Sequence, residues 1–301
     1  MVRSPPPCSA EPTPPSSRPC TYRLDEPAIS RLAEQQIAAG IHGLVPCGTT
    51  GEASTLTTAE HLRVVELTIQ AAAGRVPVLA GAASNNTRHA IELARACKQL
   101  GAAGTLQVTP YYNKPTQAGL VAHFTAIAEA SELPVVLYNV PGRTGVDLLP
   151  ETVATLARHP LIVGIKEATG DMTRLARLRE LLNGDDRFDL LSGDDFTLLP
   201  FLALGGHGVI SVTSNVAPRW LAHLCDAARN NQWDEARTWH YRQLPLCRAL
   251  FGQPNPIPVK AAMALLGRCH PDMRLPLLAI DPQSHEGQAL ADALQSLGLT
   301  P

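Results

Sequence analysis

The chain alternates short apolar runs with longer stretches in which apolar residues recur at helical spacing. From residue 25 onward, each run is followed by a loop of small and polar residues and then by an amphipathic stretch, as at residues 59–74 and 87–101. Because the runs are apolar throughout rather than alternating, they are typical of parallel strands covered on both faces. They lie at residues 43–47, 76–82, 104–110, 134–140, 161–168, 188–193 and 208–214.

This repeat predicts an α/β fold, specifically a (β/α)8 barrel. A strand and a helix recur about every thirty residues over seven units, which favours a barrel over an open doubly wound sheet. A barrel of this type closes with eight strands, and the remaining strand should precede the helix predicted at residues 25–40. Only residues 20–24 are available there, so the first barrel strand is predicted to be atypical or missing.

The chain divides into three predicted regions. Residues 1–20 are rich in proline and have few side chains that could pack, which predicts a disordered arm. This arm lacks the apolar segment of a secretory signal. Residues 21–218 form the predicted barrel. Residues 219–301 are largely helical, more than one barrel-closing helix requires, and predict an appended helical subdomain near the C-terminal end of the barrel.

The composition excludes several classes of partner. With 45% apolar residues, 17% charged residues and a net charge of -2, the chain shows no basic surface for nucleic acid. No apolar run approaches the roughly 18 residues of a membrane span. The seven cysteines form no CxxC pair and have no histidine at metal-ligand spacing, which indicates reduced thiols in the cytoplasm and no metal. We expect small-molecule substrates or copies of the same chain as partners.

One lysine interrupts the apolar run LIVGIKEATG at residues 161–170. Lys166 either has its ammonium in water beside a carboxylate at the strand's end, or it lies in an apolar site. In the second case its pKa falls, and the neutral amine is a nucleophile for carbonyl groups. A lone lysine in a strand favours the structural interpretation, so the remaining candidate residues decide between the two.

Those candidates follow the strands, since barrel enzymes carry their active sites at the C-terminal ends of the strands. Tyr138 is as late in its strand as Lys166, and adjacent parallel strands would bring its phenol toward the amine. The turn GTTGE at residues 48–52 exposes backbone N–H groups and hydroxyls that suit a small carboxylate. Arg143 could hold a second carboxylate. No glycine-rich phosphate loop is present, which disfavours nucleotide cofactors.

Three further residues have open interpretations. Tyr111 and Tyr112 are two of only five tyrosines and stand side by side late in a barrel unit. A role at the site and packing at an interface are equally consistent with them. Cys47 directly precedes the GTTGE turn, but a free cysteine is more often a small buried apolar residue than a nucleophile.

Together these motifs resemble the dihydrodipicolinate synthases (4-hydroxy-tetrahydrodipicolinate synthases), members of the N-acetylneuraminate lyase superfamily of pyruvate-dependent class I aldolases. The resemblance runs from about Leu24 to the C-terminus. The motifs that carry it, in the family's order and spacing, are GTTGE, VTPYYNKP, LYNVPGRTG, GIKEATG, LLSGDD, GGHGVISV and PNPIPVK.

The resemblance implies a barrel enzyme of lysine and diaminopimelate biosynthesis that needs no cofactor. Lys166 would form a Schiff base with pyruvate, and the resulting enamine would add to aspartate 4-semialdehyde. Tyr138 would carry protons, with Thr49 next in the relay. Tyr112 would complete this relay from the neighbouring subunit of a dimer, within a homotetramer made of two dimers.

The same resemblance implies substrate-binding residues. Thr50 and the main chain of Ile210 would hold pyruvate, and Gly193 would line the pocket. Arg143 would bind the carboxylate of the semialdehyde, which distinguishes this branch from lyases that act on sialic acid and keto-sugars.

Two differences from the family bear on activity and regulation. Family members begin with an apolar strand that ends in Thr-Pro, where this chain has its Pro-rich arm. Lysine-inhibited members carry histidine at the position of Thr58 and glutamate at that of His89, whereas His61, Asn85 and Tyr111 match. Two alternative functions therefore accompany the synthase: another pyruvate-dependent lyase, and an inactive homologue that lacks the first barrel strand.

Overall fold

A computed structural model of the chain describes residues 23–185 and 187–300. Its strands are β1 (Leu79–Gly81), β2 (Gly104–Val108), β3 (Val135–Asn139), β4 (Ile162–Glu167), β5 (Asp189–Ser192) and β6 (Gly208–Val209). The helices are α1 (Glu26–Ala38), α2 (Thr58–Ala72), α3 (Thr87–Leu100), α4 (Gln117–Ser131), α5 (Pro141–Thr144), α6 (Pro150–Leu156), α7 (Met172–Leu181), α8 (Leu198–Ala203), α9 (Pro218–Arg229), α10 (Trp233–Leu250), α11 (Ile257–Leu265) and α12 (His285–Ser296). Short 3₁₀ helices lie at Ala53–Thr55 and Thr213–Asn215.

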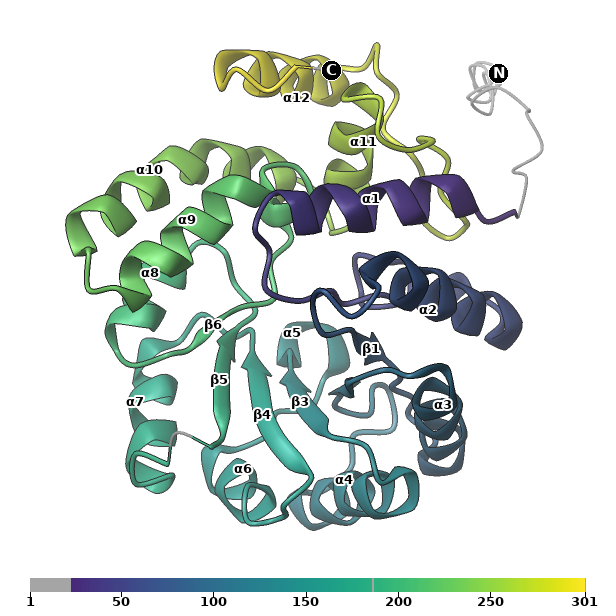
Figure 1. Cartoon of the computed structure of the whole chain (residues 1–301), viewed down its shortest axis with the longest axis vertical. Helices are drawn as coiled ribbons and strands as arrows, with labels where there is room; N and C mark the ends of the chain where they lie inside the picture. The colour runs from purple at the N-terminus through teal and green to yellow at the C-terminus, as the bar shows by residue number, and fades with distance from the viewer. Residues whose placement is uncertain (1–22, 186, 301) are drawn as a thin grey trace, which may run out of the picture.

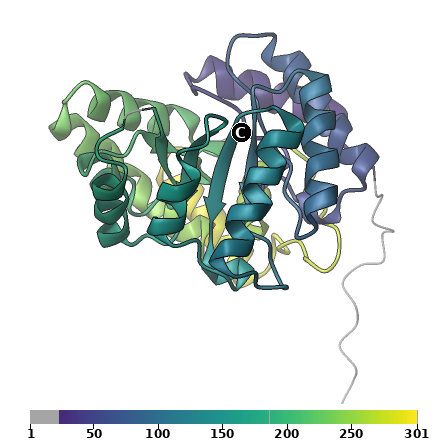
Figure 2. The same cartoon turned by 90° about the horizontal axis from the view of Figure 1, so that it is seen from below.

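The six strands form one parallel sheet in the order β1-β2-β3-β4-β5-β6. An isolated bridge between Leu44 and Val78 adds one more segment beside β1. The sheet is curled, with α3, α4, α6 and α7 on its outer side (Figure 1). The same arrangement seen from below shows these helices around the strands (Figure 2). The predicted α/β class, with successive parallel strands and outer helices, is confirmed.

The wall of the barrel is incomplete in the described part of the chain. The predicted strand at residues 43–47 is reduced to the Leu44 bridge, and the one at residues 208–214 is reduced to two residues. Residues 20–22 of the region proposed for the first strand lie outside the described residues, and Arg23 and Leu24 are not in a strand. The two shortened segments lie at the two ends of the described sheet. Among the described residues neither segment has a strand on its outer side, and regular pairing there extends over only one or two residues.

Apolar side chains form two main cores. One fills the space between the sheet and α4, α6 and α7, with Phe124, Ile127 and Leu137 fully buried. The other joins α9 to α12 around Leu224 and Leu246. The second core accounts for the largely helical pattern predicted after residue 218, and the division into domains stays a prediction.

Candidate active site

Lys166 and Tyr138 lie side by side on neighbouring strands. In the β3–β4 ladder Tyr138 is the direct partner of Lys166, and the lysine Nζ atom lies 4.2 Å from the centre of the tyrosine ring. Both are buried, at 9% and 7% exposure. The predicted approach of phenol and amine is therefore present. Of the two interpretations of Lys166, the structure favours the apolar site, because the side chain lies among the inward-facing residues of β2 to β6.

Small residues leave room around the amine. A methyl group added at Gly193 would lie 2.5 Å from the Cβ atom of Ala168 and 3.0 Å from the Cε atom of Lys166. Any larger side chain there would displace the lysine. Gly193 also donates its N–H to the Glu167 carbonyl at 2.7 Å, which brings the end of β5 against β4. Gly193 thus lies in the wall of the cavity.

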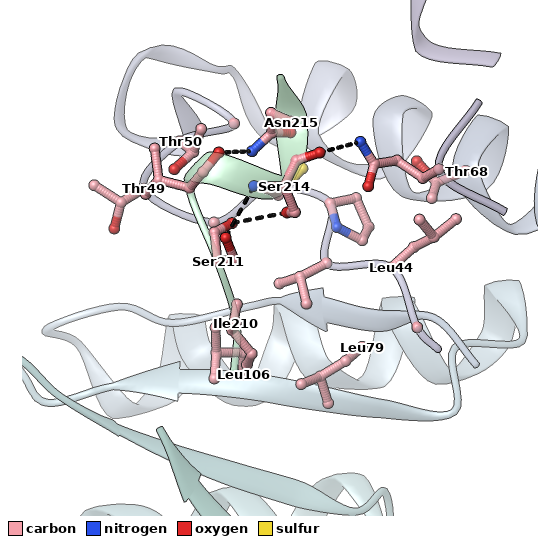
Figure 3. Close-up of a pocket in the computed structure, with 18 of the residues that line it drawn as sticks. Leu44, Thr49, Thr50, Thr68, Leu79, Leu106, Ile210, Ser211, Ser214 and Asn215 are labelled. Atoms are coloured by element: carbon pink, nitrogen blue, oxygen red, sulfur yellow. Dashed lines mark hydrogen bonds between the residues drawn. The ribbon is translucent and has the colours of Figure 1, made fainter. Parts of the chain in front are cut away.

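The GTTGE turn lines the same cavity. Close backbone contacts with β1 hold the start of the turn in place. A Cβ atom at Gly81 would lie 2.1 Å from the Cys47 carbonyl oxygen, so glycine is required where β1 passes the turn. Thr49 and Thr50 line the cavity, and the Thr50 hydroxyl accepts a hydrogen bond from the Asn255 amide at 3.0 Å. Figure 3 shows both threonines near Ser211 and Asn215, with Ile210 farther along the cavity beyond Ser211.

Ile210 follows β6 and also lines the cavity. Its N–H donates to the Ser192 carbonyl at 2.9 Å. That donor is occupied within the sheet, so of the two main-chain groups of Ile210 only the carbonyl is left to meet a ligand.

Asn255 connects two predicted binding residues and was not itself predicted as a site residue. Its side chain bonds Thr50, and its main-chain carbonyl accepts a hydrogen bond from Arg143 Nη2 at 3.1 Å. Five residues on, Lys260 of α11 pairs with Glu52 of the GTTGE turn at 2.5 Å. The sequence did contain a signal for Asn255 and Lys260: both lie in PNPIPVK, one of the motifs that carry the resemblance to the family. The C-terminal helices therefore complete the site.

Tyr112 does not join the site within one chain. Its side chain is 89% exposed, Tyr111 beside it is also exposed, and neither lines the cavity. The backbone of Tyr112 has a φ of 74°, an uncommon conformation for a residue with a large side chain. The loop thus holds an aromatic ring out into solvent.

Two other candidates have structural surroundings. Burial raises the pKa of the Cys47 thiol to about 12, which keeps it protonated at neutral pH and makes it a poor nucleophile. His61 is buried, and its Nε2 atom lies 2.7 Å from the Gly81 carbonyl. Burial lowers the pKa of the His61 imidazole. His61 therefore supports the turn beside β1 as a neutral ring.

The cavity that contains Lys166 has a volume of about 1310 Å³, above the roughly 300–1,000 Å³ of ordinary ligand pockets. It passes from Tyr138 and Arg143 through the interior of the sheet toward α1 and α9. Leu44, Leu79 and Leu106 line its inner part (Figure 3).

Two features are absent from the residues that the structure describes. No three of their His, Cys, Asp and Glu side chains group so as to hold a metal ion. None of their helices has the length and apolar character needed to cross a membrane.

Comparison with known proteins identifies relatives over nearly the whole chain. Residues 20–296 match the model of the Dihydrodipicolinate synthetase family. The 4-hydroxy-tetrahydrodipicolinate synthase of Thermodesulfovibrio yellowstonii is 50% identical over 277 residues, which are 92% of this chain and 94% of the relative. The one from Geotalea daltonii is 53% identical over 254 residues, 84% of this chain and 87% of the relative.

Solved structures agree with these relatives. The dihydrodipicolinate synthase of Acinetobacter baumannii complexed with pyruvate has a TM-score of 0.88 and 46% identity, covering 92% of this chain and 94% of that chain. The structure from Cyanidioschyzon merolae with lysine bound has a TM-score of 0.88 and 41% identity, covering 92% and 93% of the two chains. With its lysine and tyrosine paired inside a parallel α/β sheet, the chain belongs to the dihydrodipicolinate synthetase family.

Proposed function

We propose that this protein is a 4-hydroxy-tetrahydrodipicolinate synthase, a lyase that condenses pyruvate with aspartate 4-semialdehyde. The observation that carries the proposal is the buried Lys166 amine 4.2 Å from the Tyr138 ring, inside a cavity lined by Thr49, Thr50 and Arg143. The relatives at about 50% identity bear the name of this synthase. We place the enzyme in the cytoplasm, which suits the free thiols of its described cysteines.

The reaction begins when the Lys166 amine attacks the ketone carbon of pyruvate. Loss of water gives an imine, and loss of a methyl proton converts it to an enamine, whose carbon attacks the aldehyde of the second substrate. Tyr138 and Thr49 carry the protons. The amino group of the semialdehyde then attacks the imine carbon, which closes the ring and releases Lys166.

Binding of the two carboxylates is divided between two parts of the cavity. Thr50 and the carbonyl side of Ile210 surround pyruvate next to Lys166, while Gly193 leaves the space. Arg143 stands on α5 and presents its guanidinium to the carboxylate of the semialdehyde.

The assembly is a homo-oligomer in which Tyr112 of the partner subunit completes the proton relay. An exposed tyrosine on a strained backbone supports this role, because a ring that is 89% exposed among the described residues is not packed by them into this conformation. A dimer supplies the missing group, and two dimers form the tetramer.

Borohydride reduction tests the Schiff base directly. Incubation with pyruvate and borohydride should add a reduced pyruvyl group to Lys166, located by peptide mass spectrometry. Pyruvate consumption should then depend on aspartate 4-semialdehyde and not on sugar aldehydes. Absence of the label supports the inactive homologue, and turnover with sugar aldehydes supports another pyruvate lyase.

Substitution of Arg143 by alanine should separate the two substrates. A charged hydrogen bond is worth about 1.5–3 kcal/mol, so we expect the KM for the semialdehyde to rise by roughly 10–100-fold. The KM for pyruvate should change little. Steady-state kinetics with each substrate varied in turn measures the difference, and equal increases in both constants would assign Arg143 a structural role.

Inhibition by lysine should be weak. His89 lies at the matching position of an acidic residue in inhibited members, and it is exposed beside Glu92 at 3.7 Å. A histidine does not attract the ammonium group of lysine. Loss of one charged contact weakens binding by roughly ten- to a hundredfold.

The retained part of the pocket allows a test by restoration. Asn85 still donates to the Tyr111 carbonyl at 3.2 Å. His89→Glu combined with Thr58→His should therefore lower the lysine concentration needed for half-inhibition, measured in the synthase assay. Strong inhibition of the unmodified protein by submillimolar lysine would contradict this prediction.

A further inference from the structure

A buried polar network lies directly behind the Lys166–Tyr138 pair. Since side chains alternate along a strand, Asn139 and Glu167 point to the opposite face of β3 and β4 from their neighbours Tyr138 and Lys166. Asn139 and Glu167 are direct partners in the ladder, one step beyond the catalytic pair. Asn139 and Glu167 therefore link β3 to β4 immediately next to the Tyr138–Lys166 pair, on the opposite face of the sheet.

Every contact to the Glu167 carboxylate comes from a donor. The Asn139 amide donates to Oε2 at 3.1 Å and to Oε1 at 3.3 Å, the Thr169 N–H donates to Oε1 at 2.9 Å, and Arg174 Nε donates to Oε2 at 2.6 Å. Glu167 is 3% exposed. A buried carboxylate needs all of these donors, because burying a charge without hydrogen-bond partners lowers the stability of the folded state.

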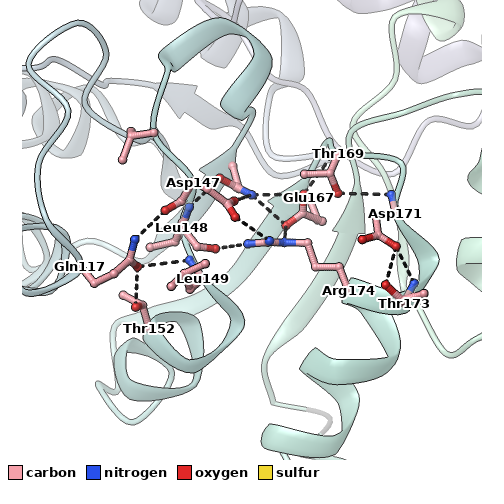
Figure 4. A network of polar contacts seen from close by, with 12 residues as sticks. Gln117, Asp147, Leu148, Leu149, Thr152, Glu167, Thr169, Asp171, Thr173 and Arg174 are labelled. Carbon is pink, nitrogen blue, oxygen red and sulfur yellow. Dashed lines mark hydrogen bonds and ion pairs between the residues drawn. The ribbon is translucent and has the colours of Figure 1, made fainter.

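The network is anchored to segments outside the two strands (Figure 4). Arg174 on α7 also binds Asp147 at 3.0 Å and the Leu148 carbonyl. Asn139 donates to Asp147 at 2.9 Å and accepts the Leu148 N–H at 3.0 Å. The ends of β3 and β4 are thus held against α7 and the loop before α6 by polar contacts in fixed directions.

We propose that Glu167 and Asn139 are positioning residues, which hold the ends of β3 and β4 in the register that places Tyr138 against the Lys166 amine. The inference rests on the function proposed above and adds residues that touch neither substrate. The β3–β4 ladder shifts register between Val135 and Val136, at the opposite end from the catalytic pair. The regular pairing that sets the position of Tyr138 against Lys166 therefore depends on contacts at the near end.

Glu167→Gln tests the proposal with little change of shape. The new amide must turn its NH₂ group toward one of the surrounding donors, so at least one contact is lost and the strands shift. A misplacement of about 1 Å costs up to roughly 100-fold in rate. We therefore expect kcat and the rate of borohydride trapping at saturating pyruvate to fall roughly 10–100-fold, with both KM values changed less than about threefold.

Glu151→Gln is the matched control. Glu151 on α6 pairs with Arg177 on α7 at 3.1 Å, which joins these two helices at the surface and includes no residue of β3 or β4. Its kcat should equal that of the unmodified protein. Arg174→Lys is the milder second variant: it keeps the charge beside Glu167 but loses the fork that reaches Asp147, and kcat should fall by roughly 3–10-fold.

Crystal structures of the unmodified protein and both network variants give a readout that needs no substrate. The Lys166 Nζ atom should lie near 4.2 Å from the Tyr138 ring in the former and farther away in the variants. Lower melting temperatures with unchanged kcat and an unchanged contact would overturn the proposal. Failure of the unmodified protein to trap pyruvate would refute the proposed function, and the crystal comparison would still decide whether the network positions the pair.

Discussion

The Lys166→Ala variant should form no borohydride-stable adduct with pyruvate and should lose synthase activity by a factor on the order of 10⁴ or more, as expected when the nucleophile of a covalent mechanism is removed. The variant should still fold, because the change removes a nine-tenths buried amine and leaves β4 paired on both sides. Its circular dichroism spectrum and melting temperature should stay close to those of the unmodified protein.

Any pyruvate adduct that still forms in Lys166→Ala must be located, because its position shows which lysine is the nucleophile. Lys114 and Lys260 are among the other lysines of the chain, and Lys260 lines the same cavity in its pair with Glu52. Lys260→Ala therefore serves as the control and should retain the adduct. Trapping that persists in Lys166→Ala, with mass spectrometry placing it at another lysine, would transfer the nucleophile's role to that residue.

A strand supplied ahead of Arg23 should stabilise the protein strongly. In the described part of the chain no strand joins the Leu44 segment to β6, and Leu79, Leu106 and Ile210 line the cavity. An apolar strand of about five residues ending in Thr-Pro would fill this layer and pair with both edges. Each buried apolar side chain contributes about 1.5–3 kcal/mol before the cost of ordering the strand.

We expect a melting temperature higher by at least about 3 °C, which corresponds to a net gain of about 2 kcal/mol at an unfolding entropy of about 2.1 cal/mol/K per residue in a chain of 301 residues. Scanning calorimetry measures it. The control carries a strand of equal length with Ser and Asn at the inward positions. This strand can form the same backbone hydrogen bonds but adds no apolar side chains to the interior of the barrel. Equal melting temperatures for the two strands would show that the cavity is not what limits stability.

The parts of the structure with local signals were predictable. Apolar runs of regular spacing indicated the parallel sheet. Tyr138 and Lys166 both stand near the C-terminal ends of adjacent strands, and this shared position indicated their contact. Strand lengths were not predictable, because pairing at residues 43–47 depends on a neighbour on the other side and not on the segment's own apolar character.

The supporting residues of the site had no local signal. Asn255 meets Thr50 across 205 positions of sequence, and Lys260 meets Glu52 across 208. Such contacts follow from how α11 packs, which no periodicity encodes. Glu167 stood beside the predicted lysine, yet its role depends on donors from β3 and α7 that only the folded chain brings together.

The bond from Asn255 to Thr50 also joins the site to a part of the chain that is synthesised late. A nascent chain that has emerged only as far as α10 contains the nucleophile and every strand described here, but its threonine turn and Arg143 lack their common partner. Substrate that binds only the completed arrangement raises the free energy of unfolding of the whole molecule. Pyruvate in the cell would thereby protect the C-terminal helices from proteolysis as well as feed the reaction.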